Sequence, residues 1–263
     1  MIRVVAENGV VYYRSKLIPC PHGFSTRIGG VSSLPYTESL NLGFGRGDGD
    51  NIVLENLALF ADAIGVSHNS FVYADQIHSS IVKKVTKNYS ADACDGLVTY
   101  EKGVTLGIKT ADCVPILLFY SGNEKKEAIV SAVHAGWRGT CGNIACAAVA
   151  EMVDMGAKVD EIKVAIGPSI KSCCYEVAKD FYDKFCDSLG ENVAKQFITV
   201  KDKEERFVAD IVGINRHLLE NCGVLTENID VANICTYCNP EEFYSHRYLG
   251  NQRGTMLSAI AIN

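Results

Sequence analysis

The sequence has no cluster of basic residues, and acidic residues outnumber basic ones. It carries 25 Lys and Arg against 31 Asp and Glu, a net charge of −6. Proteins that bind nucleic acid usually present a basic stripe, so we expect no nucleic-acid partner. No apolar run approaches the roughly 20 residues of a membrane-spanning helix. The first residues contain Glu7 and no cleavage signature, so they do not resemble a signal peptide. These absences favour a cytoplasmic protein with no membrane partner.

Proline is also scarce, with six residues among 263. We find no proline-rich linker, low-complexity tract or internal repeat, so the chain is expected to form a single domain, residues 1–263. Predicted strands and helices are mixed without a regular βαβα alternation. That order favours an α+β fold with mixed β-sheets flanked by helices over a doubly wound parallel sheet.

Cysteine, in contrast, is abundant and odd in number, with eleven residues. Without a sign of export, this count favours a reducing compartment and free thiols. Five cysteines with apolar neighbours are expected to be buried and inert: Cys94, Cys141, Cys146, Cys186 and Cys222. The vicinal pair Cys173-Cys174 and the pair Cys235-x-x-Cys238 either pack as buried thiols or form a zinc site of four thiolates. A single CxxC is a weak zinc signal, so both interpretations stay open.

Hydrophobic periodicity and turn residues predict the elements. A hairpin is expected from Ile2–Ala6 and Val10–Tyr13 around Asn8-Gly9, a strong turn signal. Helices are predicted over Asn51–Ile64 (with Asp50 as N-cap), Asn143–Met155, Ala178–Leu189 and Asp210–Asn221. Strands are predicted within Phe71–Val85 on both sides of QIHSS, and over Val104–Lys109, Val114–Phe119, Ala128–Val133, Ile162–Ile166, Ile229–Ile234 and Thr255–Ile262. SGNEKKE is expected to be an exposed turn, and His22–Ser33 and Ser39–Asp50 to be glycine-rich loops.

The candidate site centres on Thr110–Thr140, in which Cys113 precedes one apolar run and His134 follows another. His78 also follows an apolar run, in ADQIHSS. Two histidines and one cysteine form a minimal zinc site with an open position, where water would bind with a pKa of about 7. Alternatively, Cys113 and a histidine form a nucleophile–base pair. Each histidine could also be an ordinary buried residue.

Three arginines lie in glycine-rich or turn-like contexts: Arg46, Arg138 and Arg247. The planar guanidinium group suits phosphate. Arg46 and Arg247 are the expected phosphate cradle. A surface or structural role is the alternative for each of the three.

Seven segments, taken together, identify a resemblance to a known family. They are HGFSTRIGGVS, SLNLGF, DQIH, TADCVPILL, HAGWRGT, IGPSIKSCCYEV and ICTYCNPEEFYSHR. The chain resembles the YfiH-like family, also called laccase-domain or multicopper polyphenol oxidoreductase proteins and regarded as purine nucleoside phosphorylases. The segments extend over nearly the whole chain. It departs from the family pattern in QIHSS and in Arg247-Tyr248, where a second arginine is usual.

The resemblance implies a layered α+β sandwich similar to the catalytic domain of cytotoxic necrotizing factor toxins. It implies a zinc or copper site at His78, Cys113 and His134, which would also be the catalytic residues. It further implies phosphorolysis of adenosine, inosine and methylthioadenosine, with adenosine deamination as a second activity. The substrates would then be a purine nucleoside and phosphate. Candidates for substrate binding, chosen beside matched motifs or for their guanidinium groups, are Arg46, Gln76, Asp112, Arg138, Tyr175 and Arg247.

Three other functions stay open at this stage. The toxin relatives use a Cys–His pair, so a hydrolase of an amide or a peptidoglycan precursor is the main alternative. A copper polyphenol oxidase is disfavoured, because six histidines barely furnish one copper cluster. No methionine is evidently placed as an axial copper ligand. A non-catalytic module stabilised by zinc is the third alternative. The oligomeric state cannot be inferred from the sequence.

Overall fold

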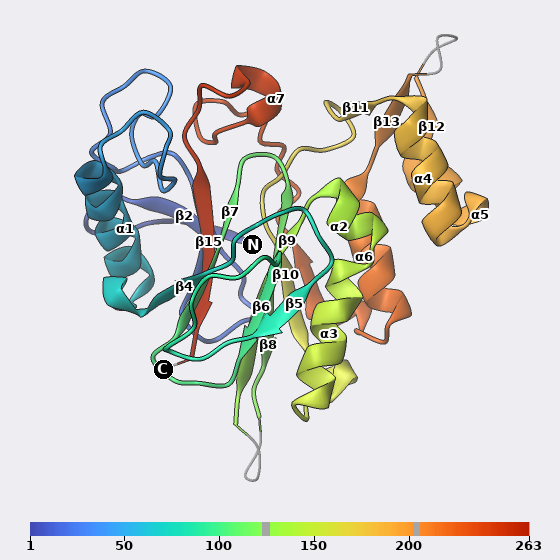
Figure 1. Ribbon diagram of the computed structural model, residues 1–263, viewed down its shortest axis with the longest axis horizontal. Coiled ribbons are helices and arrows are strands. Elements are labelled where there is room, and N and C mark those ends of the chain that lie inside the picture. The colour runs from blue at the N-terminus through green and yellow to red at the C-terminus, as the bar shows by residue number, and fades with distance from the viewer. Residues whose placement is uncertain (123–126, 202–205, 263) are drawn as a thin grey trace.

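The computed structural model describes residues 1–122, 127–201 and 206–262 (Figure 1). The expected turn at SGNEKKE lies largely outside these residues. The fold is α+β with mixed sheets, as predicted. No helix of the described residues is long and apolar enough to span a membrane.

Two six-stranded sheets form the centre of the molecule (Figure 1). The strands of the first sheet, in spatial order, are β1 (Ile2–Val5), β2 (Val11–Arg14), β3 (His22–Ser25), β15 (Met256–Ala261), β7 (Thr105–Thr110) and β4 (Phe71–Tyr73). Those of the second are β14 (Ile229–Val231), β10 (Lys163–Ile166), β8 (Val114–Tyr120), β9 (Ile129–Ala135), β6 (Gly96–Thr99) and β5 (Val82–Lys84). Most neighbours are antiparallel, but β4·β7, β5·β6 and β10·β14 are parallel. The predicted N-terminal hairpin is confirmed as β1–β2.

The alternation of side chains along the strands explains why the sheets stack. On β8, Leu117 and Phe119 join the core between the two sheets, whereas Ile116 and Leu118 join the core on the outer side. A strand buried on both faces needs a continuous apolar run, which is what Val114–Phe119 supplied. The two sheets therefore share one core, and each covers a second core on its outer face.

Helices cover both outer faces and complete a four-layer arrangement (Figure 1). Helix α1 (Asp50–Ile64) packs Leu57 and Phe60 against the first sheet. Helix α3 (Ile144–Asp154) packs Ala148 and Met152 against the second sheet, beside α6 (Ile211–Asn221). Short helices complete the fold: α2 (Trp137–Cys141), α7 (His246–Leu249), η1 (His68–Ser70), η2 (Val159–Glu161) and η3 (Thr226–Asn228).

Two local predictions need correction, and one element was not predicted. His22–Ser25 is not loop but strand β3, because it pairs with β2 and β15 in the sheet interior. Asp50 is not the N-cap of α1; Gly49 is, and Asp50 lies in the first turn, where a carboxylate favours the helix dipole. A small sheet was not predicted: β11 (Glu176–Val177), β13 (Phe207–Ala209) and β12 (Ile198–Val200) pack with α4 (Lys179–Leu189) and α5 (Glu191–Phe197).

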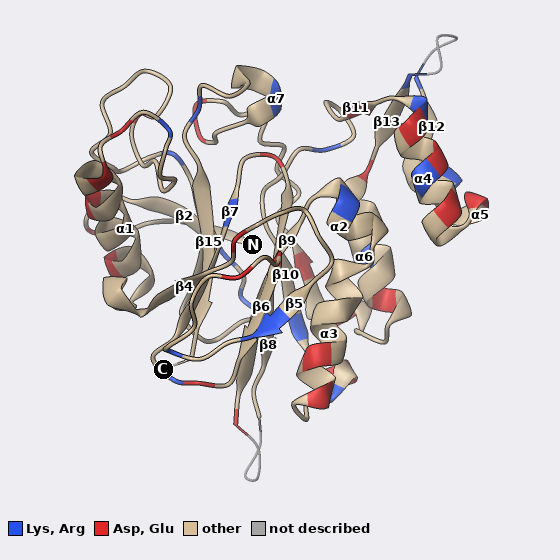
Figure 2. Ribbon diagram, viewed as in Figure 1, with Lys and Arg blue, Asp and Glu red and all other residues tan. Residues whose placement is uncertain are grey.

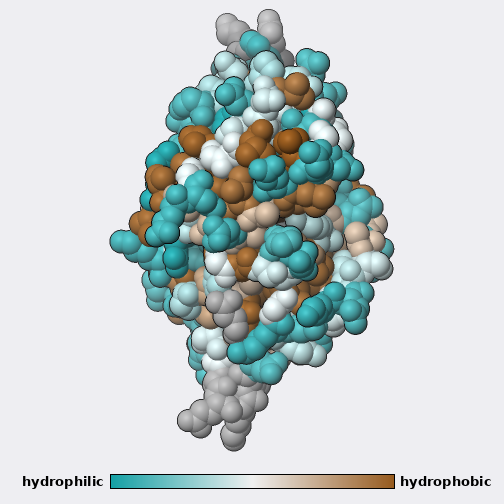
Figure 3. Space-filling model, turned by 90° about the vertical axis from the view of Figure 1, so that its left-hand side faces the viewer, coloured by the Kyte–Doolittle hydropathy of each residue, from teal (hydrophilic) through white to brown (hydrophobic). Residues whose placement is uncertain are grey.

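The surface carries charges of both signs. Lys and Arg alternate with Asp and Glu on α4 and α5 (Figure 2), where ion pairs such as Lys179–Asp183 and Lys195–Glu191 join residues one turn apart. The face that carries α1 mixes hydrophilic side chains with a band of apolar ones (Figure 3). Exposed apolar side chains of this part of the chain include Val31, Phe44 and Leu54.

Candidate metal centre

The fold brings together the three residues predicted to bind metal. His78 lies in the connection from β4 to β5, Cys113 lies between β7 and β8, and His134 lies near the end of β9. Their ligand atoms all lie within 4.8 Å of one another. Cys113 Sγ is 3.9 Å from His78 Nε2, and the two imidazole rings are nearly perpendicular, with centroids 4.8 Å apart. The β8–β9 pairing sets His134 opposite Pro115, which places it beside Cys113.

Two residues at this centre have a left-handed backbone. His78 has a φ of 61° and Asp112 a φ of 98°. Non-glycine residues adopt such angles only where surrounding contacts hold them. The carboxylate of Asp112 accepts hydrogen bonds from Thr236 Oγ1 at 2.6 Å and from the Arg247 amide at 2.7 Å. Asp112 thus fixes the turn that presents Cys113, and its carboxylate is occupied within the protein.

Asp95, at the entry to β6, was missed by the sequence analysis. Its Oδ1 accepts hydrogen bonds from the His78 amide at 3.0 Å and from His134 Nδ1 at 2.7 Å. Its Oδ2 accepts hydrogen bonds from the amide and hydroxyl of Ser79. A carboxylate on Nδ1 leaves Nε2 free for a metal and fixes the ring orientation. The only signal in the sequence was an aspartate directly before an apolar strand.

The electrostatics favour ionised groups at this centre. Burial opposes the ionisation of Asp95, but hydrogen bonds from His134 and Ser79 lower its pKa to about 2. Burial likewise opposes the protonation of His134, but Asp95 and Cys113 raise its pKa to about 9. Against burial, His134 and His78 lower the pKa of Cys113 to about 6. Cys113 and His134 thus stabilise each other's charged forms, since each shifts the pKa of the other in that direction.

Gly136, from the HAGWRG motif, keeps room for an ion. A Cβ at this position would lie 2.8 Å from His78 Cδ2 and 3.4 Å from Cys113 Sγ. Two imidazoles and a thiolate suit zinc, and they also suit copper. Among the described residues no methionine lines either cavity beside the centre, so the axial ligand typical of blue copper is not found there. The three residues fit a single metal ion.

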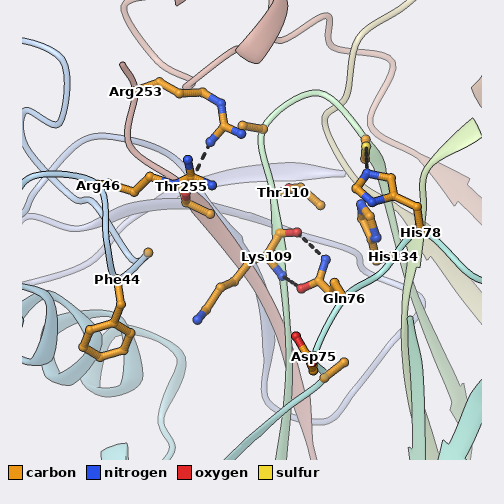
Figure 4. Close-up of a pocket in the computed structure, with 14 residues that line it drawn as sticks. Phe44, Arg46, Asp75, Gln76, His78, Lys109, Thr110, His134, Arg253 and Thr255 are labelled. Atoms are coloured by element: carbon orange, nitrogen blue, oxygen red, sulfur yellow. Dashed lines mark hydrogen bonds between the residues drawn. The ribbon is translucent and has the colours of Figure 1, made fainter. Parts of the chain in front are cut away.

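A cavity of about 310 Å³ opens beside the metal centre (Figure 4). His78, Cys113 and His134 line one end, and Arg46, Lys109 and Arg253 also line it. Among the described residues, these three cations form no ion pair, and Asp75 is the only carboxylate in the lining.

The cations of this cavity are poorly compensated. Burial and the nearby charge of Arg46 lower the pKa of Lys109, and the same two causes lower that of Arg253 to about 10. Within the described part of the chain, the buried Nε of Arg253 has no hydrogen-bond partner. An anion in the cavity would pair with the cations and could accept a hydrogen bond from Arg253 Nε. The sequence analysis missed Lys109 and Arg253, since a lysine within a strand and an arginine in a C-terminal turn carry no local signal.

A second cavity, also about 310 Å³, lies on another side of the metal centre and shares His78, Cys113 and Arg253 with the first. Tyr175 and Arg247 line it, and the guanidinium carbon of Arg247 lies 5.2 Å from the centre of the Tyr175 ring. Arg46 and Arg247 therefore line different cavities instead of a common one.

Two other candidates for substrate binding, Gln76 and Arg138, interact with neighbouring residues of the protein. Both ends of the Gln76 amide bond to the backbone of Lys109, at 2.8 and 2.7 Å, so Gln76 lines the first cavity with its polar atoms engaged (Figure 4). Arg138 stacks on Trp137, with 4.3 Å between the guanidinium carbon and the ring centre. It lines a separate hollow with Lys184, and neither cavity at the metal centre includes it.

The sequence and the layered α+β fold match an established family. The sequence profile of the multi-copper polyphenol oxidoreductase laccase family matches residues 21–263, and the chain belongs to this family. The chain is similar in structure to a Bacillus licheniformis protein, described as hypothetical protein YfiH. The TM-score is 0.88 and the identity 29%, over 99% of both chains. YlmD from Geobacillus stearothermophilus is also similar, with a TM-score of 0.84 and 28% identity over 99% of this chain and 98% of that one.

Curated relatives bear enzyme names. A purine nucleoside phosphorylase of Deinococcus radiodurans is 36% identical over 97% of this chain and 94% of its own length. The mouse purine nucleoside phosphorylase LACC1 is 36% identical over 92% of this chain, which spans only 55% of that relative. A protein of an unknown prokaryote, named adenosine deaminase RL5, is 33% identical over 94% of this chain and 95% of its own length. At the level of the family, these names support an enzyme of purine nucleosides.

Proposed function

We propose that residues 1–263 form one catalytic domain, a metal-dependent purine nucleoside phosphorylase that uses zinc in preference to copper. Its substrates would be adenosine, inosine and methylthioadenosine, together with phosphate. The observation that carries the proposal is the position of a cavity with three cations that form no ion pair among the described residues, directly beside a His–Cys–His centre. A phosphorylase needs an anion site next to the group that assists departure of the base, and this arrangement suits that requirement.

In the proposed reaction, Arg46, Lys109 and Arg253 hold hydrogen phosphate in the first cavity. A phosphate oxygen forms a bond to C1′ of the ribose while the bond from C1′ to the purine nitrogen breaks. The proton of hydrogen phosphate passes to the purine, and the products are the free base and ribose 1-phosphate (methylthioribose 1-phosphate from methylthioadenosine). The ion held by His78 and its partners would supply Lewis acidity that stabilises the departing base.

The second cavity would bind the purine. Tyr175 offers an aromatic face and Ile170 an apolar one, and neither residue lines the proposed phosphate cavity. Arg247 is then expected to contact the nucleoside rather than the phosphate. A side activity, in which water replaces the amino group at C6 of adenosine, is supported by the relative named adenosine deaminase. The roles of Gln76 and Asp112 would be to position Lys109 and Cys113.

Product analysis by chromatography tests this function. We expect the zinc-loaded protein to convert adenosine to adenine and ribose 1-phosphate only when phosphate is present, with some inosine formed in parallel. Cys113→Ala should abolish adenine release, whereas Cys186→Ala on helix α4 should not. Adenine release that does not depend on phosphate would indicate a nucleosidase, and no change in any purine nucleoside would refute the proposal.

One observation favours a second function, a Cys–His hydrolase of an amide or a peptidoglycan precursor. Cys113, His134 and Asp95 have the nucleophile, base and orienting carboxylate of such enzymes, and the low pKa of Cys113 suits a nucleophile. Alkylation distinguishes the two functions, because a metal ligand is occupied and a nucleophile is free. Protection of Cys113 from iodoacetamide until a chelator is added would support the phosphorylase. Rapid labelling of zinc-loaded protein would support the hydrolase.

A further inference from the structure

A second group of potential metal ligands lies outside both cavities. The thiols of Cys173, Cys174, Cys235 and Cys238 all lie within 4.8 Å of one another. Cys174 Sγ is 3.3 Å from Cys238 Sγ, and Cys173 Sγ is 3.6 Å from it. None of the four lines either cavity at the metal centre. We propose that these four cysteines bind a structural zinc ion as thiolates, separate from the ion at His78, Cys113 and His134.

The spacing of the sulfur atoms fits this ion. In a tetrahedral site with zinc–sulfur bonds of about 2.3 Å, the sulfurs are about 3.8 Å apart. The distances of 3.3 and 3.6 Å and the common limit of 4.8 Å bracket that value. Four donors from protein close the coordination sphere, as in structural rather than catalytic zinc sites.

One of the four thiols, Cys235, is buried, whereas Cys173 and Cys238 are exposed. A buried thiolate needs a cation beside it, and the zinc ion would supply that charge.

The site would join two loops that are distant in sequence. Cys173 and Cys174 follow β10, whereas Cys235 and Cys238 follow β14. The loops already meet at a parallel bridge between Ser169 and Cys235, with a hydrogen bond of 3.1 Å from the Thr236 amide to the Ser169 carbonyl. Beyond that bridge each loop forms a turn of its own, with hydrogen bonds such as the one from the Cys174 amide to the Lys171 carbonyl at 2.9 Å.

Both loops also carry parts of the candidate active site. Tyr175 follows Cys174 and lines the second cavity. Thr236 follows Cys235 and donates to the carboxylate of Asp112, the residue before Cys113. A zinc ion at the four cysteines would thus stabilise the wall of the site without touching a substrate.

Zinc counting by elemental analysis tests the proposal. We expect about two zinc ions per chain in the protein purified without chelator, and about one in Cys238→Ser or Cys174→Ser. The control Cys186→Ser alters a cysteine outside both sites and should keep about two. The double variant His78→Ala/Cys113→Ala should keep about one ion, and adding Cys238→Ser should remove it. A double variant without zinc, or a Cys238→Ser protein with the wild-type count, would overturn the proposal.

A measurement on the unaltered protein covers the case in which a variant does not fold. Iodoacetamide labelling followed by peptide mass spectrometry should find Cys173, Cys174, Cys235 and Cys238 protected with zinc and labelled after chelation, whereas Cys20 should label equally in both. Labelling of these four thiols in zinc-loaded protein contradicts the proposal, and so does a disulfide among them, seen as a loss of two hydrogens. Because the four sites are scored separately from Cys113, either result leaves the proposed phosphorylase activity to its own test.

Discussion

At the scale of single residues, the candidate site depends on side chains that orient others. Asp95 bonds to His134 and to the backbone of His78, and Asp112 bonds to Thr236 and Arg247. Both carboxylates are buried. They are engaged with the protein, so their roles are to position ligands and loops. The groups left free to meet a substrate are the cations of the first cavity and the aromatic wall of the second.

Asp95→Asn is expected to weaken zinc binding at the His–Cys–His centre by about 10–100-fold, the usual effect of losing an orienting carboxylate. The side chain of the new asparagine has no negative charge to stabilise His134. Its NH₂ group is a donor and would replace an oxygen of Asp95 that accepts hydrogen bonds. Competition with a chromophoric chelator measures the change. Asp75→Asn, which alters a carboxylate that lines the first cavity and has no hydrogen bond to either histidine among the described residues, is the matched control. Equal zinc affinity in both variants would contradict this role.

Arg46→Ala should raise the KM for phosphate about 10-fold or more, since a hydrogen bond to a charged group contributes about 1.5–3 kcal/mol. The KM for the nucleoside should change much less, because Arg46 lines the first cavity only. Initial rates at varied phosphate and varied adenosine separate the two constants. Arg216→Ala, which alters an exposed arginine paired with Glu220 on α6, is the control. Equal increases in both KM values would reject the phosphate role.

At the scale of elements, strand ends and short turns position the chemistry. β8 and β9 are antiparallel neighbours, so the start of β8 lies beside the end of β9, and Cys113 and His134 come together there. Strand β3 instead carries a buried histidine with a structural role. His22 Nε2 accepts a hydrogen bond from the Ser15 amide at 2.9 Å, and Nδ1 lies 2.8 Å from the Cys20 carbonyl. This pattern requires a neutral ring that donates from Nδ1.

His22 should therefore make the stability of the protein fall in mild acid. Burial lowers its pKa in the folded state below the ordinary value of about 6.5. As pH falls through 6.5, the unfolded state takes up the proton first. The contribution of neutral His22 is thus complete above about pH 6.5 and is lost below it, toward the folded pKa.

Urea unfolding between pH 7.5 and 5 measures this effect against His22→Gln. The variant should lose about 1–3 kcal/mol at pH 7.5, because a buried hydrogen-bonded pair is disturbed. It should also show a shallower decline of stability with falling pH than the wild type. Parallel pH profiles would show that His22 does not contribute to the acid sensitivity.

At the scale of the whole molecule, the four layers separate the histidines. His78, in the connection from β4 to β5, and His134, in β9, lie together beside Cys113. The other four lie in other elements: His22 in β3, His68 in η1, His217 in α6 and His246 in α7. All six histidines of the chain belong to the described residues. His246 lines the second cavity with His78, but among the described residues only His78 and His134 place imidazole ligand atoms within 4.8 Å of each other and of Cys113. A multi-copper cluster requires more imidazoles than these two around shared ions.

We accordingly expect copper-loaded protein to show no oxidation of phenols above the rate of free copper, although the family is named for that activity. Oxygen uptake with a phenolic substrate is the measurement, with an equal concentration of copper alone and Cys113→Ala protein as controls. A rate that saturates with phenol and is lost in Cys113→Ala would contradict this expectation.

The sequence by itself determined the continuous apolar runs, and with them the buried strands of the two sheets. Val114–Phe119 has no polar residue and Ala128–Val133 has only Ser131, whose hydroxyl donates to the Leu97 carbonyl, so both runs had to lie inside a layered fold. The sequence also determined helix ends at glycine, because a left-handed C-cap depends only on the local residue. Gly65, which ends α1, has this backbone conformation. Together with the motifs around them, these runs also placed Cys113 and His134 at strand ends.

Only the tertiary structure decided which polar side chains share a cavity. Asp95 and His134 are 39 residues apart, Arg46 and Arg253 line one cavity, and Arg46 and Arg247 do not. Cys173 and Cys238, 65 residues apart, likewise come together only in the fold. No local pattern encodes such pairs, because their distances depend on how the sheets stack and where each loop returns. Burial and charge, which set the pKa values of Cys113, Lys109 and Arg253, arise from that same assembly.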